Sequence, residues 1–202
     1  MWKRKLEVML HYNQTAVSYD AQYAEEQNAK IRAALSDAHL REDGLVLDMG
    51  CGTGLLFPNI ADKARLLVGL DISPNLLRQA QKHAKQYPNI ALVQADADHT
   101  PFKNQTFHTL FAITLLQNMP EPTATLEEMK RITKPEAVII LTSLKKKFTR
   151  EAITEILEKT GLKVTTLKTN SKIKDHIITC QNQAFPNENH ATQRRKRQEE
   201  NR

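Results

Sequence analysis

Residues 45–54 read Leu45-Val46-Leu47-Asp48-Met49-Gly50-Cys51-Gly52-Thr53-Gly54. A short apolar run that passes into glycines spaced G-x-G-x-G is typical of a buried strand ending in a tight turn. Glycine at the carboxyl end of a strand lets the backbone approach a ligand closely, and a helix that opens there favours a negative group. The stretch therefore predicts a buried strand, a glycine turn that opens a helix, and a ligand site at that turn.

The spacing of these glycines argues against a dinucleotide site. The dinucleotide fingerprint is G-x-G-x-x-G, but Leu55 stands where its last glycine belongs. Asp48, two residues before the first glycine, would face a pyrophosphate badly, whereas an ammonium group suits a carboxylate. The turn thus predicts a ligand that carries an amino-acid arm and no phosphate.

Strand-like and helical stretches alternate along the rest of the chain. The apolar runs predict strands at 45–49, 66–70, 90–95, 109–114, 137–144, 162–168 and 176–181. The intervening segments predict helices at 21–40, 75–87, 123–133 and 149–160. Strands that alternate with helices indicate an α/β fold with a doubly wound sheet. We expect a single-domain, Rossmann-like, mostly parallel seven-stranded sheet whose last two strands form an antiparallel hairpin.

Two further carboxylates end the second and third predicted strands. Asp71 follows Asp48 at the distance expected of the acid that accepts from ribose hydroxyls in such folds, although it could also cap the next helix, a role for which Ser73 is better placed. Asp96 follows the third strand and could accept a hydrogen bond from an exocyclic adenine amine. Asp98, in the same loop, is the alternative candidate for this role. The three strand ends together predict a nucleoside pocket along one edge of the sheet.

These motifs resemble those of the class I S-adenosylmethionine-dependent methyltransferases, in particular the group with the quinone-biosynthesis C-methyltransferases. The resemblance covers about residues 11–182 and rests on V-L-D-x-G-C-G-T-G at 46–54, G-L-D-I-S at 69–73, Q-A-D-A at 94–97, and the stretch 126–135. It departs from the family at 134–137, where Lys-Pro-Glu-Ala replaces the usual Pro-Gly-Gly turn. The resemblance implies S-adenosyl-L-methionine as the cofactor.

The resemblance also implies roles for individual residues. Asp48 and the glycine turn would hold the methionine arm, Asp71 the ribose hydroxyls, and the residues after the second and third strands the adenine, while the first tyrosine of a Y-x₆-Y-D opening would close over the cofactor. The implied cofactor residues are Tyr12, Asp48, Gly50, Cys51, Gly52, Gly54, Asp71, Ile72, Asp96, Ala97 and Thr114.

Acceptor contacts are expected from the loop after the fourth strand and from the N-terminal lid. The candidates on that side are Tyr19, Gln117 and Asn118. The loop lacks the Asn-Pro-Pro-Tyr turn of amino-group methylators, and amides stand where related small-molecule enzymes have histidines, so no general base is visible. A small-molecule acceptor is favoured over RNA or protein, and a non-catalytic cofactor-binding subunit is the third alternative.

Composition and charge limit the classes of protein to which this chain can belong. The chain has 202 residues, 40% of them hydrophobic, and a formal net charge of +6. It has no apolar run near the roughly 20 residues of a membrane span, and the basic residues at its start precede no apolar leader. Cys51 and Cys180 have no CxxC partner, so neither a disulfide framework nor a metal site is expected. We expect a cytoplasmic protein.

The positive charge is concentrated in the C-terminal third and at the ends. Residues 143–174 hold nine Lys or Arg against three Glu, with the run Lys145-Lys146-Lys147, and a second basic run occupies 194–197. Such runs can bind RNA but are more often solvated surface, and few aromatic residues lie among them. The predicted organisation is an N-terminal lid segment at 1–20, a cofactor domain at 21–182, and a disordered basic tail at 183–202.

Overall fold

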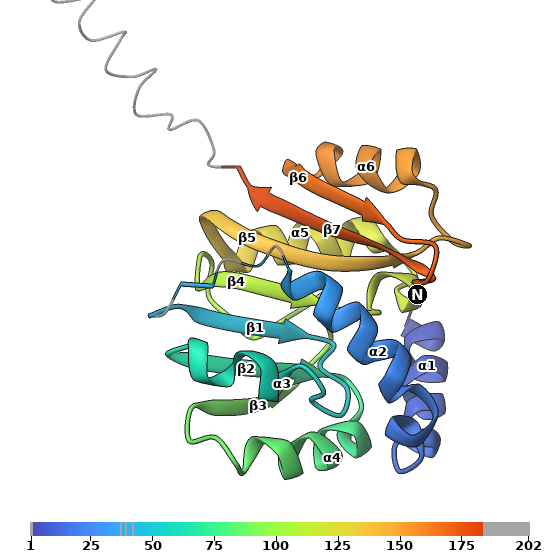
Figure 1. Ribbon diagram of the computed structural model, residues 1–202, viewed down its shortest axis with the longest axis vertical. Coiled ribbons are helices and arrows are strands. Elements are labelled where there is room, and N and C mark those ends of the chain that lie inside the picture. The colour runs from blue at the N-terminus through green and yellow to red at the C-terminus, as the bar shows by residue number, and fades with distance from the viewer. Residues whose placement is uncertain (1, 37, 39, 42, 184–202) are drawn as a thin grey trace, which may run out of the picture.

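The computed structural model describes residues 2–36, 38, 40–41 and 43–183, which form one mixed sheet with helices on both faces (Figure 1). The strand order is β3-β2-β1-β4-β5-β7-β6, and β7 pairs antiparallel with both β5 and β6. The sequence prediction of a seven-stranded Rossmann-like sheet with an antiparallel hairpin at its end is confirmed. The strands are β1 (Leu45–Met49), β2 (Leu66–Asp71), β3 (Ile90–Gln94), β4 (Phe107–Ala112), β5 (Thr133–Leu144), β6 (Leu162–Thr169) and β7 (Asp175–Asn182).

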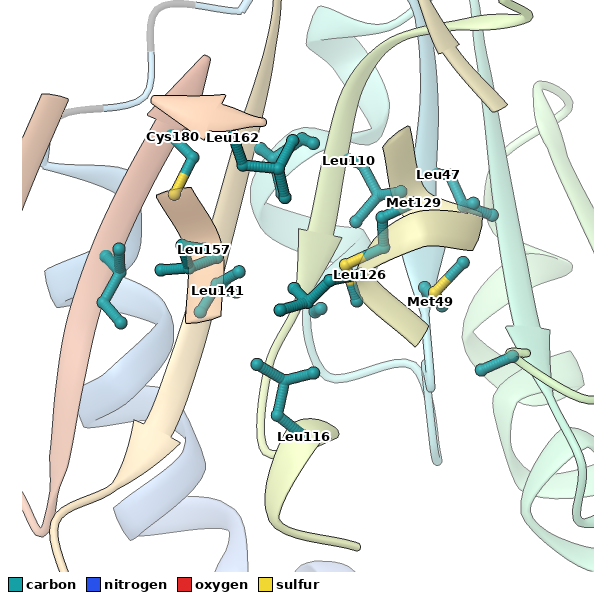
Figure 2. Close-up of a cluster of buried hydrophobic side chains, with 14 of the residues drawn as sticks. Leu47, Met49, Leu110, Leu116, Leu126, Met129, Leu141, Leu157, Leu162 and Cys180 are labelled. Atoms are coloured by element: carbon teal, nitrogen blue, oxygen red, sulfur yellow. The ribbon is translucent and has the colours of Figure 1, made fainter. Parts of the chain in front are cut away.

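Successive residues of a strand point to opposite faces of the sheet, so both faces carry apolar side chains, and helices cover both. Two hydrophobic clusters result, one against α2, α3 and α4 and one against α5 and α6. Figure 2 shows the second cluster, in which Leu47 and Met49 of β1 lie near Leu126 and Met129 of α5. The helices are α1 (Trp2–Thr15), α2 (Tyr19–Leu35), α3 (Phe57–Ile60), α4 (Pro74–Ala84), α5 (Pro122–Ile132) and α6 (Arg150–Lys159), with short 3₁₀ turns at Ala61–Lys63 and Leu116–Asn118.

The N-terminal segment of the structure is a pair of helices. In Figure 1, α1 and α2 lie at the end of the sheet to which β1 and β2 point, which is the carboxyl edge. Hydrogen bonds attach α1 to the start of α4, since Ser73 Oγ donates to Asn13 Oδ1 at 2.6 Å and Asn75 Nδ2 donates to the Asn13 carbonyl at 3.0 Å. Thr53 Oγ1 donates to Asp20 Oδ1 at 2.6 Å and attaches α2 to the glycine turn. Both helices thus close over the strand ends.

The glycine turn does not open directly into a long helix, which corrects the sequence prediction. Residues 50–56 form turns, and α3 spans only Phe57–Ile60. Pro58 explains the late start, because proline has no amide hydrogen and is confined to the first turn of a helix. By contrast, α4 begins as predicted, with Pro74 in its first turn and Ser73 Oγ accepting from the Leu76 amide at 3.1 Å.

The segment 134–137 is part of β5 rather than a turn before it. The register with β4 shifts between Phe107 and Thr109, and Glu136 has a φ of 64°. The departure from the Pro-Gly-Gly pattern is therefore accommodated as an irregularity in the strand, at the amino end of β4 and away from the carboxyl edge.

The C-terminal tail and a possible membrane span were the subject of two sequence predictions. The predicted disordered tail, apart from Gln183, lies outside the described residues. Within the described ranges, none of the helices combines the length and the apolar character needed to cross a bilayer.

Candidate functional site

A cavity lies at the carboxyl ends of β1, β2 and β4, beneath α1. Its space free of protein atoms is about 700 Å³, including the part open to solvent. Most of the residues expected at the cofactor and acceptor sites line it, namely Tyr12, Tyr19, Gly50, Gly52, Asp71, Ile72, Asp96, Ala97, Thr114 and Asn118. Asp48 and Cys51 line a smaller adjoining cavity, which shares Tyr19, Gly50 and Gly52 with the first. Gly54 and Gln117 line neither.

The glycine turn is folded back onto the end of β2. The amides of Gly50 and Cys51 both donate to the Leu70 carbonyl, at 2.7 and 2.9 Å. Gly52 has a φ of 56°, and a Cβ built there would meet no atom within 4 Å. Gly54 has a φ of 83°, and its Cβ would lie 2.6 Å from the Phe57 ring. The missing side chain at Gly52 therefore leaves space for a ligand, whereas at Gly54 it leaves space for the buried Phe57 ring.

This contrast gives a prediction about stability. Gly52→Ala is expected to cost about 1–2 kcal/mol, since only its left-handed backbone is strained. Gly54→Ala is expected to cost about 2–5 kcal/mol, because crowding against the Phe57 ring adds to the same strain. Urea unfolding of the two variants measures the difference directly. Equal losses would mean that the Phe57 ring moves aside without cost.

Asp71 is a buried carboxylate that braces two backbone segments. Its Oδ2 accepts from the Gly52 amide at 2.9 Å, and its Oδ1 accepts from the Ser73 amide at 2.8 Å. Burial raises the pKa of Asp71, and these backbone hydrogen bonds oppose the increase. Each oxygen keeps a second lone pair, so the carboxylate can brace the turn and still accept from a ligand at the cavity wall.

Asp48 is 3% exposed, at the end of β1 beneath the turn. Burial, together with the negative charge of Asp71, raises the pKa of Asp48 to about 8. Burial makes ionisation of this carboxyl group costly, and a cation bound beside it removes that cost. The pair of acids therefore favours a cationic ligand in the adjoining cavity.

The raised pKa of Asp48 predicts a pH dependence of folding. Between about pH 4 and pH 8 the folded chain holds a proton on Asp48 that the unfolded chain releases, so stability falls as the pH rises. Asp48 is expected to contribute about 1.4 kcal/mol per pH unit to this slope, and Asp48→Asn, which mimics the protonated acid, is expected to remove that contribution. Urea unfolding of both proteins at several pH values isolates this slope, and parallel curves would contradict the assignment.

The acidic loop after β3 is joined to α1 by a buried lysine. Lys5 Nζ contacts both oxygens of Asp96, at 2.8 and 2.7 Å, and forms an ion pair with Asp98. Asp98 also accepts from Thr125 Oγ1 at 2.5 Å and is buried. Of the two competing acids, Asp96 lines the cavity, whereas Asp98 is tied to α5. Lys5 was not predicted from the sequence, and its i, i+3, i+7 spacing with Val8 and Tyr12 is the signal that could have found it.

Aromatic side chains connect the two N-terminal helices to the loop after β4. Asn118 Nδ2 donates to the Tyr12 hydroxyl at 3.1 Å and to the Thr114 carbonyl at 2.9 Å. The rings of Tyr12 and Tyr19 meet edge to face, with centroids 5.9 Å apart. Burial is the main cause that raises the pKa of both tyrosines. Two helices and one loop thus meet over the cavity, with neutral phenols at its rim.

A buried polar cluster holds Thr114 in position. Thr114 has a φ of 62°, and its amide donates to Thr142 Oγ1 at 2.8 Å while its hydroxyl donates to Gln27 Oε1 at 2.9 Å. Lys30 Nζ lies 3.4 Å from the same hydroxyl and 2.8 Å from Asp175 Oδ2 of β7. Lys30 and Asp175 are 2% and 0% exposed. α2 and β7 therefore fix the left-handed residue that opens the loop after β4.

The lysine run after β5 is largely engaged with the protein itself. Lys145 Nζ donates to the carbonyls of Asn170 and Ile173, and Lys147 Nζ donates to the carbonyl of Gln117. Gln117 therefore meets this loop through its backbone rather than lining the cavity with its side chain. His11 and His99 are exposed and do not line the cavity.

Among the residues that the structure describes, no group of His, Cys, Asp or Glu is arranged to hold a metal ion. Cys51 and Cys180 are buried free thiols, and burial raises the pKa of each. Both thiols are packing residues in the hydrophobic clusters.

Known proteins share parts of this sequence and most of this fold. Residues 47–141 match the family model for a methyltransferase domain. The chain is 30% identical over 109 residues to the demethylmenaquinone methyltransferase of Staphylococcus haemolyticus, an alignment that covers 52% of this chain and 46% of that protein. The chain spans about half the length of the curated relatives it matches.

Two solved structures show the same fold at low sequence identity. Magnesium protoporphyrin IX methyltransferase from Synechocystis PCC 6803, with bound S-adenosylmethionine, has a TM-score of 0.74 and 19% identity, covering 90% of this chain and 97% of that one. A chain from the complex of the Haloferax volcanii Trm112 methyltransferase activator with a candidate methyltransferase has a TM-score of 0.76 and 15% identity, covering 86% and 98%.

Proposed function

We propose that this chain, which carries a methyltransferase domain and resembles the class I S-adenosylmethionine-dependent methyltransferases, binds S-adenosylmethionine at the carboxyl edge of its sheet. We further propose that it transfers the methyl group to a small-molecule acceptor. One observation carries the proposal: the open space at Gly52 lies beside the two buried carboxylates of Asp48 and Asp71. A cationic nucleoside without phosphate fits that arrangement.

Each group at the cavity has a part in binding this cofactor. The Asp71 carboxylate would accept hydrogen bonds from the ribose hydroxyls, and Asp48 would offset the positive charge of the amino-acid arm. Ile72 and the Ala97 backbone would contact the adenine, with Asp96 at its edge. When bound, S-adenosylmethionine supplies an activated methyl group on a sulfonium.

Alignment and exclusion of water are the contributions expected from the protein, because displacement at a sulfonium has a neutral leaving group. Val8 and Tyr12 of α1 cover the cavity, and the hydrogen bond from Asn118 to Tyr12 joins this cover to the loop after β4. The lining of Ile113, Leu115 and Met119 supports an acceptor with apolar surface. Tyr19 and Asn118 would meet that acceptor.

Two other functions receive support from particular observations. A basic C-terminal third supports RNA or protein as the acceptor, but Lys145 and Lys147 are bonded to backbone carbonyls. The fold's likeness to a chain from a complex with a methyltransferase activator supports a subunit that is active only with a partner, or that only binds the cofactor. The small-molecule acceptor remains the leading proposal because the acceptor side of the cavity is apolar.

Calorimetric titration with S-adenosylmethionine tests the cofactor proposal. Because the raised pKa of Asp48 keeps it protonated at pH 7, binding of a cation is expected to release a proton. Titrations in two buffers of different ionisation enthalpy measure that release, and it should disappear in Asp48→Asn. Absence of binding would overturn the proposal.

Transfer of a radiolabelled methyl group into a cell lysate tests the acceptor. Label in the small-molecule fraction supports the leading proposal, whereas label in RNA or protein would replace it. Cofactor binding without label in any fraction would favour the subunit that only binds the cofactor.

A further inference from the structure

The large apolar side chains exposed on the described residues gather on one part of the molecule. Trp2 is 56% exposed, Leu10 54%, Val17 87% and Tyr23 42%. All four belong to α1, the turn after it, or the first part of α2. Single exposed apolar residues are normal, but a local group of them marks an interaction surface.

Besides the side that faces the cavity, α1 has a second, narrow apolar stripe. Lys5, Val8 and Tyr12 line the cavity. Trp2, Leu6 and Leu10 are spaced four residues apart and therefore share another side of the helix, where Leu6 is half-buried and the other two are exposed. Between this stripe and the cavity-lining side, α1 presents the exposed polar residues Lys3, Glu7 and His11.

Positive charge flanks this stripe. Lys3 and Arg4 are exposed and follow Trp2 in the sequence, and the exposed Glu7 is an acid on the same helix. The loop after β5 adds exposed Lys146, and Lys147, whose Nζ donates to the Gln117 carbonyl, is also exposed. Burial together with the positive charge of Arg4 lowers the pKa of Lys147. Cations of two elements thus lie near one another, and an anionic surface would relieve their repulsion.

We propose that the outer side of α1 and the turn after it, formed by Trp2, Leu6, Leu10 and Val17 with Lys3 and Arg4, docks on the surface of an anionic lipid bilayer. Tryptophan and leucine beside lysine and arginine are the combination by which interfacial helices bind such membranes. α1 has 14 residues, which suits a helix lying in the interface rather than crossing it.

This chemistry favours a bilayer over the other partners that a basic surface could take. RNA would use the cations but has no complement for the aliphatic Leu10 and Val17, since it stacks on aromatic and guanidinium groups. Self-association through the same patch is distinguished from vesicle binding by the experiment below.

Fluorescence tests the proposal because Trp2 is the only tryptophan of the chain. With vesicles of equal parts phosphatidylglycerol and phosphatidylcholine, Trp2 emission is expected to shift to shorter wavelength and to be quenched by brominated acyl chains. Pure phosphatidylcholine vesicles should produce a much weaker effect. The full chain is used, and vesicle binding does not require methyl transfer.

Variants separate the two parts of the surface. Lys3→Glu with Arg4→Glu, and separately Leu10→Gln, are each expected to weaken vesicle binding by about tenfold or more. Lys63→Glu with Lys85→Glu is the charge-matched control, since both lysines are exposed near the amino ends of β2 and β3. This control should bind as the unaltered chain does.

Several results would overturn the proposal. Vesicle binding with unchanged Trp2 emission would mean that other basic segments make the contact. An emission shift that depends on protein concentration and not on vesicles would indicate self-association instead. Tighter binding to an RNA oligonucleotide than to the anionic vesicles, or equal losses in the control, would exclude a specific bilayer surface on α1.

Discussion

Replacing Asp71 with asparagine is expected to weaken the binding of S-adenosylmethionine by at least about 100-fold. The change removes a charged acceptor from the cavity wall, and two hydrogen bonds to a charged group contribute about 3 kcal/mol or more together. Asparagine keeps the shape but has one acceptor oxygen in place of two. Calorimetry with the purified variant measures the affinity.

The design must separate binding from folding, because Asp71 also braces the glycine turn. Asparagine can accept from the Gly52 amide or the Ser73 amide but not from both with the same oxygen geometry. A loss of about 1–3 kcal/mol in the free energy of unfolding is therefore expected as well. Titration is made where thermal unfolding shows the variant to be folded, and Asp62→Asn, an exposed acid, serves as the control. An affinity within threefold of the unaltered chain would contradict the role of Asp71.

Replacing Lys30 with methionine is expected to lower the free energy of unfolding by about 3–5 kcal/mol, since it leaves the buried charge of Asp175 without its partner. Lys30 Nζ contacts Asp175 Oδ2 at 2.8 Å and Glu26 Oε1 at 3.0 Å, and the lysine and Asp175 are both inaccessible to solvent. Urea unfolding measures the loss.

A double variant tests whether the loss comes from the unpaired charge. Lys30→Met combined with Asp175→Leu removes both charges and is expected to recover much of the stability, because apolar pairs often replace buried ion pairs at little cost. Lys63→Met, at an exposed lysine, should change stability by less than about 0.5 kcal/mol. If the double variant is no more stable than the single one, the effect of Lys30 lies in packing and not in its charge.

The sheet could be predicted from the sequence because its signals are local. The apolar runs at 45–49 and 66–70 have the length and composition of buried strands, and the structure has β1 and β2 there. The positions of Asp48 and Asp71 at one edge followed from the parallel arrangement alone. α1 was not predicted as a helix, because its apolar residues are divided between two sides and its basic start resembles an unstructured end.

The partners of the buried lysines could not be predicted for a different reason. Lysine is normally a surface residue, and nothing in the neighbourhood of Lys5 or Lys30 in the sequence indicates their partners. Asp98 and Asp175 lie far along the chain, and only the folded structure brings them close. The glycine turn was predicted to open a helix directly, whereas α3 begins only at Phe57, with Pro58 in its first turn.

The ion pair between α2 and β7 has a consequence for the order in which the protein can be made. During synthesis α2 emerges early, whereas β7 is the last strand of the described chain and inserts between β5 and β6. Until β7 leaves the ribosome, Lys30 has no Asp175 to neutralise it and α2 cannot bury it without cost. Docking of α2, and with it the seating of Thr114 at the rim of the cavity, is therefore a late event, and a chain truncated before β7 should be a target for quality-control proteases.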